Sequence, residues 1–349
     1  MTESRLWILG APDPEMEAIE ALLRECGERV IHAKLPSGER IRSGQFGAPV
    51  HTGDASTVYT VECDLPLAYG EPEHEPDVGQ VIIDGRRYMS ARHSALRIDH
   101  HAPGDPGYGR PPSEFLAASS IGQVIAELAR LGRLPEAWPR LGTSWGWTWQ
   151  RGELVTRGGH PDQPGFPLGW WVATREEGET GDASYGSDCG ETAEVPRDLV
   201  LCAAADHCLG AAYRGECPGV DPDALMRWRV ESRARFQGRS EEQILADIEK
   251  ARAVLRAVPE LELAPGVWAK DMRRVKVYEL PEASARENLC FVADGLPGPD
   301  GRVKVVCQSG SPEQIRAFMV HWAPAQSLTD IYGDPQRGFA GAYLADALP

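Results

Sequence analysis

The sequence has no run of about 18 apolar residues, and it therefore predicts no membrane-spanning helix. Basic residues are also in the minority. The chain has 36 lysines and arginines against 52 aspartates and glutamates, a formal net charge of −16 at pH 7. This balance disfavours a protein that coats long nucleic acids, because such binding requires cationic side chains at many phosphates. A short nucleotide or another small phosphate ester held by a metal remains compatible with it.

The sequence also has no C-x-x-C pair. Its eight cysteines are scattered through 349 residues, a length that does not need disulfides for stability. Cys202, Cys208 and Cys217, together with His207, offer ligands for zinc, but their spacing is irregular. Buried thiols are the favoured interpretation of these cysteines. Packing beside Asp206 is likewise the favoured interpretation of His207.

The beginning of the chain has no apolar segment of the kind found in signal peptides. Met1 to Arg5 is polar and is followed directly by a predicted core strand. We therefore expect a cytoplasmic protein.

Apolar runs alternate with helical periodicity through the first third of the chain. The runs predict strands over residues 5–10, 29–34, 58–63 and 95–98. The periodicity predicts helices over 15–26 and 113–133. Such alternation is typical of an α/β domain with a mainly parallel sheet, in which ligands bind at the carboxyl ends of the strands.

The composition changes between about residues 138 and 196. Half of the ten tryptophans, Trp145, Trp147, Trp149, Trp170 and Trp171, follow Trp138 here among glycines, prolines and acidic residues. We expect an insertion built as a β-hairpin with long loops, in which the tryptophans pack locally. An exposed platform for stacking bases is the alternative use of these rings.

Helical segments and a second domain follow. An apolar helix is expected over 198–213, and two amphipathic helices over 222–259. Strands are expected at 275–280, 289–292 and 303–307, with a helix over 312–321. The predicted division is a metal-binding α/β domain over 1–221, a helical connector over 222–259 and a smaller α+β domain over 260–349.

The residues with the clearest chemistry follow predicted strands. Asp99-His100-His101 comes after one strand, and Asp64 ends another. Asp13 and Glu15 lie in the loop after the first strand, and Asp206 lies in an apolar helix, where an unpaired carboxylate is costly. Three such polar residues alone are more often surface groups. Gathered at one edge of a sheet, these residues would form an oxygen and nitrogen site suited to Mn²⁺ or Mg²⁺. Two such ions activate water and neutralise phosphoryl oxygens.

The order of these segments resembles the DHH phosphoesterase superfamily, which includes RecJ-type exonucleases, nanoRNases, cyclic-dinucleotide phosphodiesterases and manganese pyrophosphatases. Ile98-Asp99-His100-His101 is similar to the third motif of that family, and Ala117-Ala118-Ser119-Ser120 to the small residues after it. Val61 to Asp64 resembles the second motif, and Leu201 to Asp206 the fourth. Leu9 to Glu15 resembles the first motif, H-x-x-P-D-x-D, with Leu9 in place of its histidine and Glu15 in place of its second aspartate.

The end of the chain resembles the substrate-binding domain that accompanies DHH domains. Val303 to Ser309 is similar to a strand that ends in Arg-Ser, with Gln308 in place of the arginine. Gly333 to Gly341 is similar to the phosphate-gripping loop G-G-G-H-x-x-A-A-G, with Arg337 near the position of its histidine. The resemblance implies that substrate contacts Ser309, Arg337, Gly338 and Gly341.

The resemblance implies a divalent-metal-dependent phosphoesterase that hydrolyses a nucleotide, a short oligonucleotide or a related phosphate ester. The metal ligands would be Asp13, Glu15, Asp64, His100 and Asp206, and the cofactor Mn²⁺ or Mg²⁺. Catalysis would involve Asp99, His101 and Arg337, with His101 and Arg337 neutralising the transferring phosphoryl group.

Two departures from the family favour an alternative. Leu9 replaces a metal-binding histidine and Gln308 an arginine, as expected of a DHH-like protein that binds a nucleotide or a partner without cleaving it. A third interpretation is that the DHH tripeptide is coincidental in an unrelated α/β enzyme. A homodimer is compatible with the sequence under all three.

Overall fold

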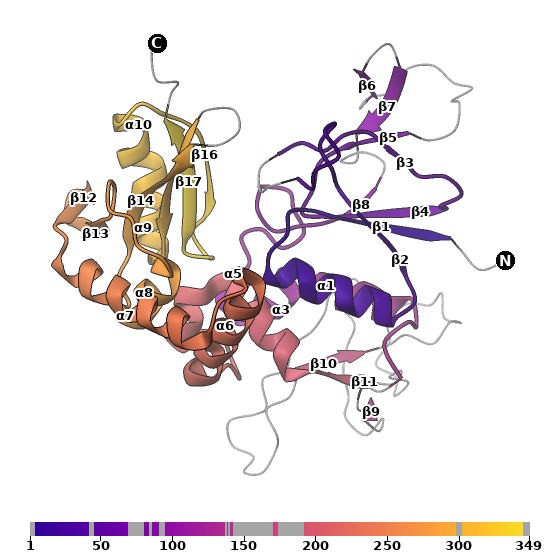
Figure 1. Ribbon diagram of the computed structural model, residues 1–349, viewed down its shortest axis with the longest axis horizontal. Helices are drawn as coiled ribbons and strands as arrows, with labels where there is room; N and C mark the ends of the chain where they lie inside the picture. Colours follow the sequence, from indigo (N-terminus) through magenta and orange to yellow (C-terminus); the bar gives the residue numbers. More distant parts are fainter. Residues whose placement is uncertain are drawn as a thin grey trace, which may run out of the picture.

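The structure is a computed structural model of the chain (Figure 1). It describes residues 4–41, 45–68, 80–83, 86–90, 95–136, 138, 140–141, 170–173, 192–297 and 302–344. These residues form a mixed α/β protein, as the sequence predicts. None of the helices in the described ranges is long and apolar enough to cross a membrane.

A parallel sheet of four strands organises the N-terminal part of the chain. Its strands are β1 (Arg5–Leu9), β2 (Arg29–His32), β4 (Thr57–Val61) and β8 (Leu96–Ile98), in the order β2-β1-β4-β8. All four lie where the apolar runs predict strands. Since every pair is parallel, the carboxyl ends of all four strands meet at one edge of the sheet.

Helices cover one face of this sheet. They are α1 (Pro14–Glu25), α3 (Phe115–Ala118), α4 (Ser120–Arg130) and α5 (Arg197–Tyr213), and a short 3₁₀ turn, Pro112–Glu114, precedes α3. Trp7, Leu9 and Tyr59 on that face are buried against them in the largest hydrophobic cluster. The single helix predicted over 113–133 is divided, because Ser119 has extended backbone (φ −66°, ψ 155°) and caps α4.

The other face of the parallel sheet contacts a small second sheet. Leu6, Ile8 and Val58 are buried here with Leu65 and Leu67. The second sheet has the order β3-β5-β7-β6 and contains β3 (Val50–His51), β5 (Pro66–Ala68), β7 (Arg86–Ser90) and β6 (Gln80–Ile83). The parallel sheet is therefore buried on both faces, which agrees with its nearly continuous apolar strands.

The predicted insertion is described only at its ends and at one inner strand. The strands β10 (Trp170–Ala173) and β11 (Thr192–Val195) pair antiparallel, and β11 also pairs with β9 (Arg140–Leu141). This pairing fits the predicted hairpin. The prediction for the remaining insertion, including Trp145, Trp147 and Trp149, lies outside the described residues.

Two long helices lead to the C-terminal sheet. The helices α6 (Pro222–Gln237) and α7 (Glu241–Ala257) lie where the sequence predicts two amphipathic helices. The sheet has the order β12-β13-β14-β15-β17-β16. Its strands are β12 (Glu260–Ala264), β13 (Val267–Asp271), β14 (Phe291–Pro297), β15 (Val303–Gln308), β16 (Leu328–Asp334) and β17 (Phe339–Leu344).

Helices lie mainly on one side of this sheet. The helix α9 (Pro312–Ala317) continues through a π-helical turn, Phe318–Trp322, into α10 (Ala323–Ala325), and Phe318 packs on the core face of the sheet. The helix α8 (Leu280–Glu287) packs on α5 and α7. The strand predicted at 275–280 is wrong: residues 275–279 form a loop, and Leu280 begins α8, whose second residue is Pro281.

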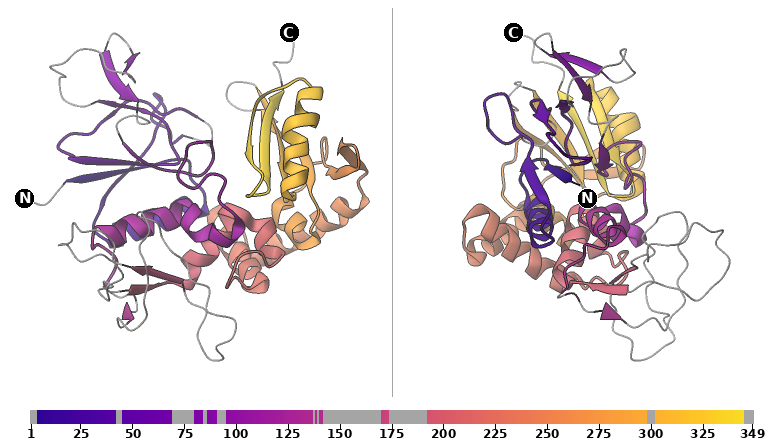
Figure 2. Two further views of the ribbon diagram at one scale, coloured as in Figure 1. Left: turned by 180° about the vertical axis from the view of Figure 1, so that it is seen from behind. Right: turned by 90° about the vertical axis from the view of Figure 1, so that its right-hand side faces the viewer.

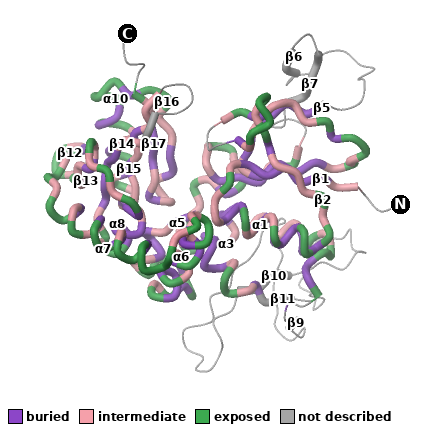
Figure 3. The backbone as a smooth tube through the Cα atoms, in the orientation of Figure 1, coloured by how far each residue is buried: buried purple, intermediate pink, exposed green. Residues whose placement is uncertain are grey.

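The parallel sheet and the C-terminal sheet are separate from each other in space. In Figures 1 and 2 the C-terminal sheet lies beside the N-terminal sheets, and in the view of Figure 1 the helices α5 and α6 lie below the C-terminal sheet. Buried residues are concentrated in the parallel strands and in the helices packed on them (Figure 3). The carboxyl edge of the parallel sheet lies where the two parts of the chain approach each other.

Candidate metal centre

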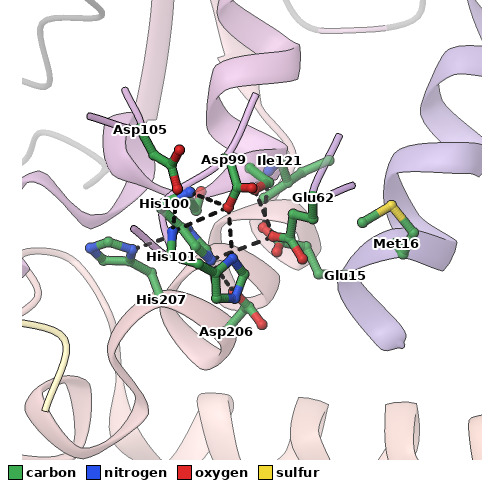
Figure 4. A network of polar contacts seen from close by, with 12 residues as sticks. Glu15, Met16, Glu62, Asp99, His100, His101, Asp105, Ile121, Asp206 and His207 are labelled. Carbon is green, nitrogen blue, oxygen red and sulfur yellow. Dashed lines mark hydrogen bonds and ion pairs between the residues drawn. The ribbon is translucent and has the colours of Figure 1, made fainter. Parts of the chain in front are cut away.

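Four segments bring acidic and histidine side chains to the carboxyl edge of the parallel sheet (Figure 4). Glu15 lies in the first turn of α1, and Glu62 follows β4 directly. Asp99, His100 and His101 follow β8, and Asp206 comes from α5. The parallel pairing explains this convergence, because each strand delivers its following residue to the same edge.

Glu15, Glu62, His100 and Asp206 form a compact group. Each offers one ligand atom, and these atoms all lie within 4.8 Å of one another. His100 Nε2 lies 3.2 Å from Asp206 Oδ2 and 3.4 Å from Glu62 Oε1. A second group, Glu62, His100 and His101, overlaps the first and meets the same distance criterion.

This group fits a divalent cation. Glu15 Oε2 is buried and has no partner within the described part of the chain. His100 Nε2 and Asp206 Oδ2 are buried and form a close pair with each other without the geometry of a hydrogen bond. Buried polar atoms in proteins are otherwise nearly always paired. Carboxylate oxygens with one imidazole nitrogen make a mixed donor set of the kind that Mn²⁺ or Mg²⁺ accepts.

The crowding of carboxylates changes their protonation. Burial, together with the nearby Asp206, raises the pKa of Glu15 well above its ordinary value. Burial likewise raises the pKa of Glu62 to about 8, and that of Asp13 to about 6. Burial alone would also raise the pKa of Asp206, but His100 and Arg337 reverse the effect and lower it. A cation at this position would favour the charged form of all of them.

The N-terminus of α4 holds two of these carboxylates. The backbone N–H of Ile121 donates to Glu15 Oε1 at 2.9 Å, and Ser120 Oγ donates to Glu62 Oε1 at 2.7 Å. Ser119 caps the helix by accepting from the N–H of Gly122 at 3.1 Å. A helix N-terminus carries a partial positive charge, so it stabilises both acids in their charged form.

Asp99 orients the histidines and does not join the metal group. Its Oδ1 accepts from the N–H of His100 at 2.7 Å and lies 2.7 Å from His101 Nδ1. Its Oδ2 accepts from Arg97 at 2.7 Å. Burial would raise the pKa of Asp99, but His101 and Arg97 lower it overall, so this carboxylate is charged. Asp105 adds bonds to the N–H groups of His101 and Ala102.

The two histidines of this segment have opposite electrostatic surroundings. Burial and the nearby Arg337 lower the pKa of His100 to about 4, so its imidazole is neutral and its nitrogen can bind a metal. Burial would lower the pKa of His101 as well, but Glu62 and Asp99 raise it overall. His101 therefore tends toward the imidazolium form.

His207 lies behind His100. Its Nδ1 is 3.3 Å from His100 Nδ1, and the residue is buried. Since two ring nitrogens can share only one proton, this contact requires one nitrogen to donate and the other to accept. If His100 binds a metal through Nε2, its Nδ1 carries the proton and donates to His207. His207 thus fixes the tautomer that metal binding needs.

Arg337 joins the C-terminal part of the chain to this centre. Its guanidinium donates to the carbonyl oxygens of His207 at 3.1 Å, Asp206 at 3.3 Å and His100 at 3.4 Å. Backbone at Cys208 departs from helical geometry (φ −154°, ψ 49°), directly after two of these residues. Such a break opens hydrogen bonds between helical turns and leaves carbonyl oxygens for another donor.

The structure brings three of the five predicted metal ligands together: Glu15, His100 and Asp206. Asp13 lies nearby, but it belongs to neither group of candidate ligands and caps α1, accepting from the N–H of Met16 at 2.7 Å. Asp64 also belongs to neither group and pairs with Arg97 at 2.7 Å. Glu62, which the sequence analysis did not select, occupies the group instead. No sequence signal selects it, because Glu62 falls inside the strand predicted over 58–63, and the structure ends that strand at Val61.

Three of the predicted substrate-binding residues lie directly after β15, in the turn between β16 and β17, and within β17. Ser309 has left-handed backbone (φ 59°), and its hydroxyl contacts Ser284 Oγ at 2.6 Å. Gly338 (φ 71°) leaves room for the carbonyl of Gly310, which an added Cβ would meet at 2.8 Å. Gly341 lies under the ring of Tyr332, which an added Cβ would meet at 2.6 Å.

The cysteines within the described ranges do not take part in the candidate centre. Cys208 Sγ lies 3.0 Å from Cys217 Sγ, and burial raises the pKa of the Cys202 and Cys208 thiols well above the ordinary value. Neutral thiols are poor zinc ligands. Within the described ranges, the groups able to hold a metal contain no cysteine. This arrangement agrees with buried thiols.

Comparisons with protein-family models, with curated proteins and with solved structures found no match to the chain.

Proposed function

We propose that the protein is a divalent-metal-dependent phosphoesterase. The observation that carries this proposal is the group formed by Glu15, Glu62, His100 and Asp206, whose ligand atoms lie within 4.8 Å of one another, with Glu15 Oε2 buried and unpaired among the described residues. The resemblance of Asp99-His100-His101 to the DHH motif supports the same reaction class. Mn²⁺ or Mg²⁺ is the expected cofactor, because the donors are mostly carboxylate oxygens.

The chain's own residues have distinct tasks in this proposal. Glu15, Glu62, His100 and Asp206 would hold the ion, with Asp13 at the margin of the site. When bound, the ion would activate water and polarise the phosphoryl oxygens of the ester. Asp99 and Asp105 hold the segment 99–102 in place, and α4 holds the acids.

His101 is the proposed group for contact with the ester. Its side chain is 40% exposed, and its Nδ1 is held by Asp99 at 2.7 Å. This contact leaves Nε2 for a phosphoryl oxygen or for the leaving group, to which a raised pKa allows it to donate a proton. Arg337 adds positive charge from the C-terminal part, but three backbone carbonyls occupy its guanidinium. We propose that Arg337 mainly positions the backbone of the site.

Metal binding and hydrolysis can be tested together. Calorimetric titration of the full chain with Mn²⁺ should give saturable binding that His100→Ala abolishes and His321→Ala, an exposed histidine, leaves unchanged. The wild-type chain with Mn²⁺ should hydrolyse bis-p-nitrophenyl phosphate or a dinucleotide, and His100→Ala should not. Absence of Mn²⁺ binding would overturn the proposal. Tight binding of metal and nucleotide without turnover would identify a binding protein instead.

A further inference from the structure

Two cysteine thiols meet near the end of the helix α5. Cys208 lies within α5, and Cys217 lies nine residues later in the turn that joins α5 to α6. Their Sγ atoms are 3.0 Å apart, and the two residues are 1% and 2% exposed. The sulfurs of a disulfide are about 2.05 Å apart, so these atoms need to move by only about 1 Å to become bonded.

The end of α5 brings the second thiol back to the first. The N–H of Glu216 donates to the carbonyl of Ala211 at 3.0 Å, which reverses the chain after the helix. Gly215 has left-handed backbone (φ 76°), a conformation common directly after helices and favourable for glycine. This helix ending returns Cys217 to Cys208.

Cys217 is the buried residue of a surface turn. Gly215, Glu216, Pro218 and Gly219, on either side of it, are exposed. Local opening of so short a turn exposes the Cys217 thiol to a small reagent and does not require α5 to unfold. An oxidant can therefore reach the pair in the folded chain.

The other close pair of thiols lies on a different backbone. Cys290 Sγ and Cys307 Sγ are 3.5 Å apart. Cys307 pairs with Val292 across β14 and β15, so Cys290 lies diagonal to it. Diagonal positions of an antiparallel sheet are about 7–8 Å apart, which exceeds the Cα separation that a disulfide spans without backbone movement. We expect this pair to stay reduced.

Cys208 is also the residue at which α5 departs from helical geometry (φ −154°, ψ 49°). The carbonyl oxygens of the two residues directly before it accept from Arg337. After it, Gly210 lies so close to the C-terminal part that an added Cβ would meet Ser309 Cα at 3.2 Å. The backbone at Cys208 thus directs the last turn of α5 toward the C-terminal sheet.

We propose that Cys208 and Cys217 are a redox-active pair whose disulfide fixes the break in α5. The oxidant is a low-molecular-weight disulfide such as oxidised glutathione. Two S–H bonds of the chain break and one Sγ–Sγ bond forms, and the two protons and two electrons convert the oxidant into two thiols. An excess of dithiothreitol reverses the step. This inference is independent of the proposed function, because the bond forms without a metal or a phosphate ester.

Peptide mapping tests the bond. The full chain is incubated with oxidised glutathione, its free thiols are blocked with N-ethylmaleimide, and it is digested with trypsin. Trypsin places Cys208 and Cys217 in separate peptides, 198–214 and 215–227, so a disulfide between them joins the two peptides. We expect the joined peptides, and before blocking we expect the intact mass of a single chain that has lost two hydrogen atoms.

Variants assign the bond to its two sulfurs. Cys217→Ala removes a thiol from the surface turn and should abolish the joined peptides. Cys202→Ala is the matched control, because Cys202 is a buried thiol of the same helix and the same tryptic peptide, and the joined peptides should persist. Linkage of Cys290 to Cys307 in place of this pair would overturn the proposal. So would the absence of joined peptides both in the folded chain and in a chain refolded from urea in the same redox buffer.

Stability and hydrogen exchange measure the effect on α5. A disulfide that closes a loop of about ten residues lowers the equilibrium constant of unfolding by about 100-fold. Urea unfolding with and without dithiothreitol should show this change, and the amide N–H groups of residues 209–213 should exchange more slowly in the oxidised chain. Cys217→Ala should show neither difference. Unchanged exchange in residues 209–213 of a bonded chain would contradict the proposal that the bond fixes the break.

Discussion

Two carboxylates lie two residues apart after β4 and have different partners. Glu62 has left-handed backbone (φ 49°), and its carboxylate joins His100 and Asp206. Asp64 pairs with Arg97, which also holds Asp99 and Asp105. The first carboxylate is thus available to a cation, whereas the second supports the segment that carries the histidines.

Exchange of each carboxylate for its amide distinguishes these roles. Glu62→Gln should weaken Mn²⁺ binding by more than about 10-fold, because it removes a charged ligand. Asp64→Asn should change the Mn²⁺ affinity less, since Arg97 keeps two other acidic partners. Calorimetric titration of both variants measures this. A larger effect of Asp64→Asn would make Asp64 the ligand, as the sequence analysis expects.

His207 gives a second prediction at this scale. Its Nδ1 lies 3.3 Å from His100 Nδ1, so His207→Phe removes the acceptor that holds the proton on that nitrogen. Loss of an outer partner of a ligating histidine costs about 10- to 100-fold in metal affinity. We expect this loss in a Mn²⁺ titration, together with a changed tautomer of His100 in ¹⁵N spectra. Unchanged affinity and tautomer would assign His207 to packing alone.

Among the elements, α4 has two adjacent serines at its N-terminus with different tasks. One stabilises the helix, and the other contacts the candidate metal centre. Ser119 caps the helix, whereas the hydroxyl of Ser120 donates to Glu62. The preceding helix α3 is short and ends at the same serine. The break between α3 and α4 therefore creates the helix N-terminus that faces Glu15 and Glu62.

Substitution of each serine by alanine should have a different effect. Ser119→Ala should lower the free energy of unfolding by about 0.5–2 kcal/mol, because the N-cap bond is lost. Ser120→Ala should leave the cap intact and weaken Mn²⁺ binding. Urea unfolding and calorimetry on both variants measure the two effects. The idea fails if Ser120→Ala destabilises the chain as much as Ser119→Ala does and leaves Mn²⁺ affinity unchanged.

The elements differ in how far the sequence predicts them. The four parallel strands are apolar runs buried on both faces, so their pattern is strong. The break at Ser119 was missed because the apolar positions on either side continue one helical stripe. The glycines of residues 333–341 are typical of a loop and hide the strands β16 and β17, although Gly341 lies within a strand beneath Tyr332.

The residues of the candidate site also differ in how far the sequence predicts them. Glu15, His100 and Asp206 could be predicted because each lies at or near a strand end or in an apolar helix. Glu62 could not be separated from Asp64 by residue type. Only the backbone conformation after β4 decides which acid turns toward His100.

For the whole molecule, ion pairs join the helices α6 and α7 to α8. Glu282 of α8 is fully buried and pairs with Arg229 of α6 through Nε at 3.0 Å. Burial would raise the pKa of Glu282, but Arg229 and Arg233 lower it below its ordinary value. Hydrogen bonds from Arg256 and Arg252 lower the pKa of the neighbouring Glu287 to about 2.

Acid should therefore weaken the folded state through this interface. The pKa values of Glu282 and Glu287 are lower in the folded chain than in the unfolded chain, where the pKa of glutamate is about 4.3. The stabilisation is complete above that value and is lost as pH falls toward about 2. Glu282→Leu should lower the free energy of unfolding by about 3–5 kcal/mol at pH 7, because Arg229 is left buried and unpaired.

The companion variant is Arg229→Met/Glu282→Leu, which should recover part of that loss. Urea unfolding of the three chains between pH 7 and pH 3 measures both effects. If Glu282→Leu keeps the full acid sensitivity of the wild-type chain, the sensitivity belongs to other carboxylates.

The candidate ligands come from positions far apart in the sequence, from Glu15 in α1 to Asp206 in α5. This separation determines when the site can form during folding. During synthesis, Asp206 leaves the ribosome long after the first three strands, so an ion cannot guide their early pairing. Such distant contacts form late in folding. A bound ion would therefore slow the unfolding rate and leave the refolding rate nearly unchanged. Stopped-flow measurements of both rates with and without Mn²⁺ test this expectation. A slower unfolding rate alone would show that the ion stabilises only the folded structure.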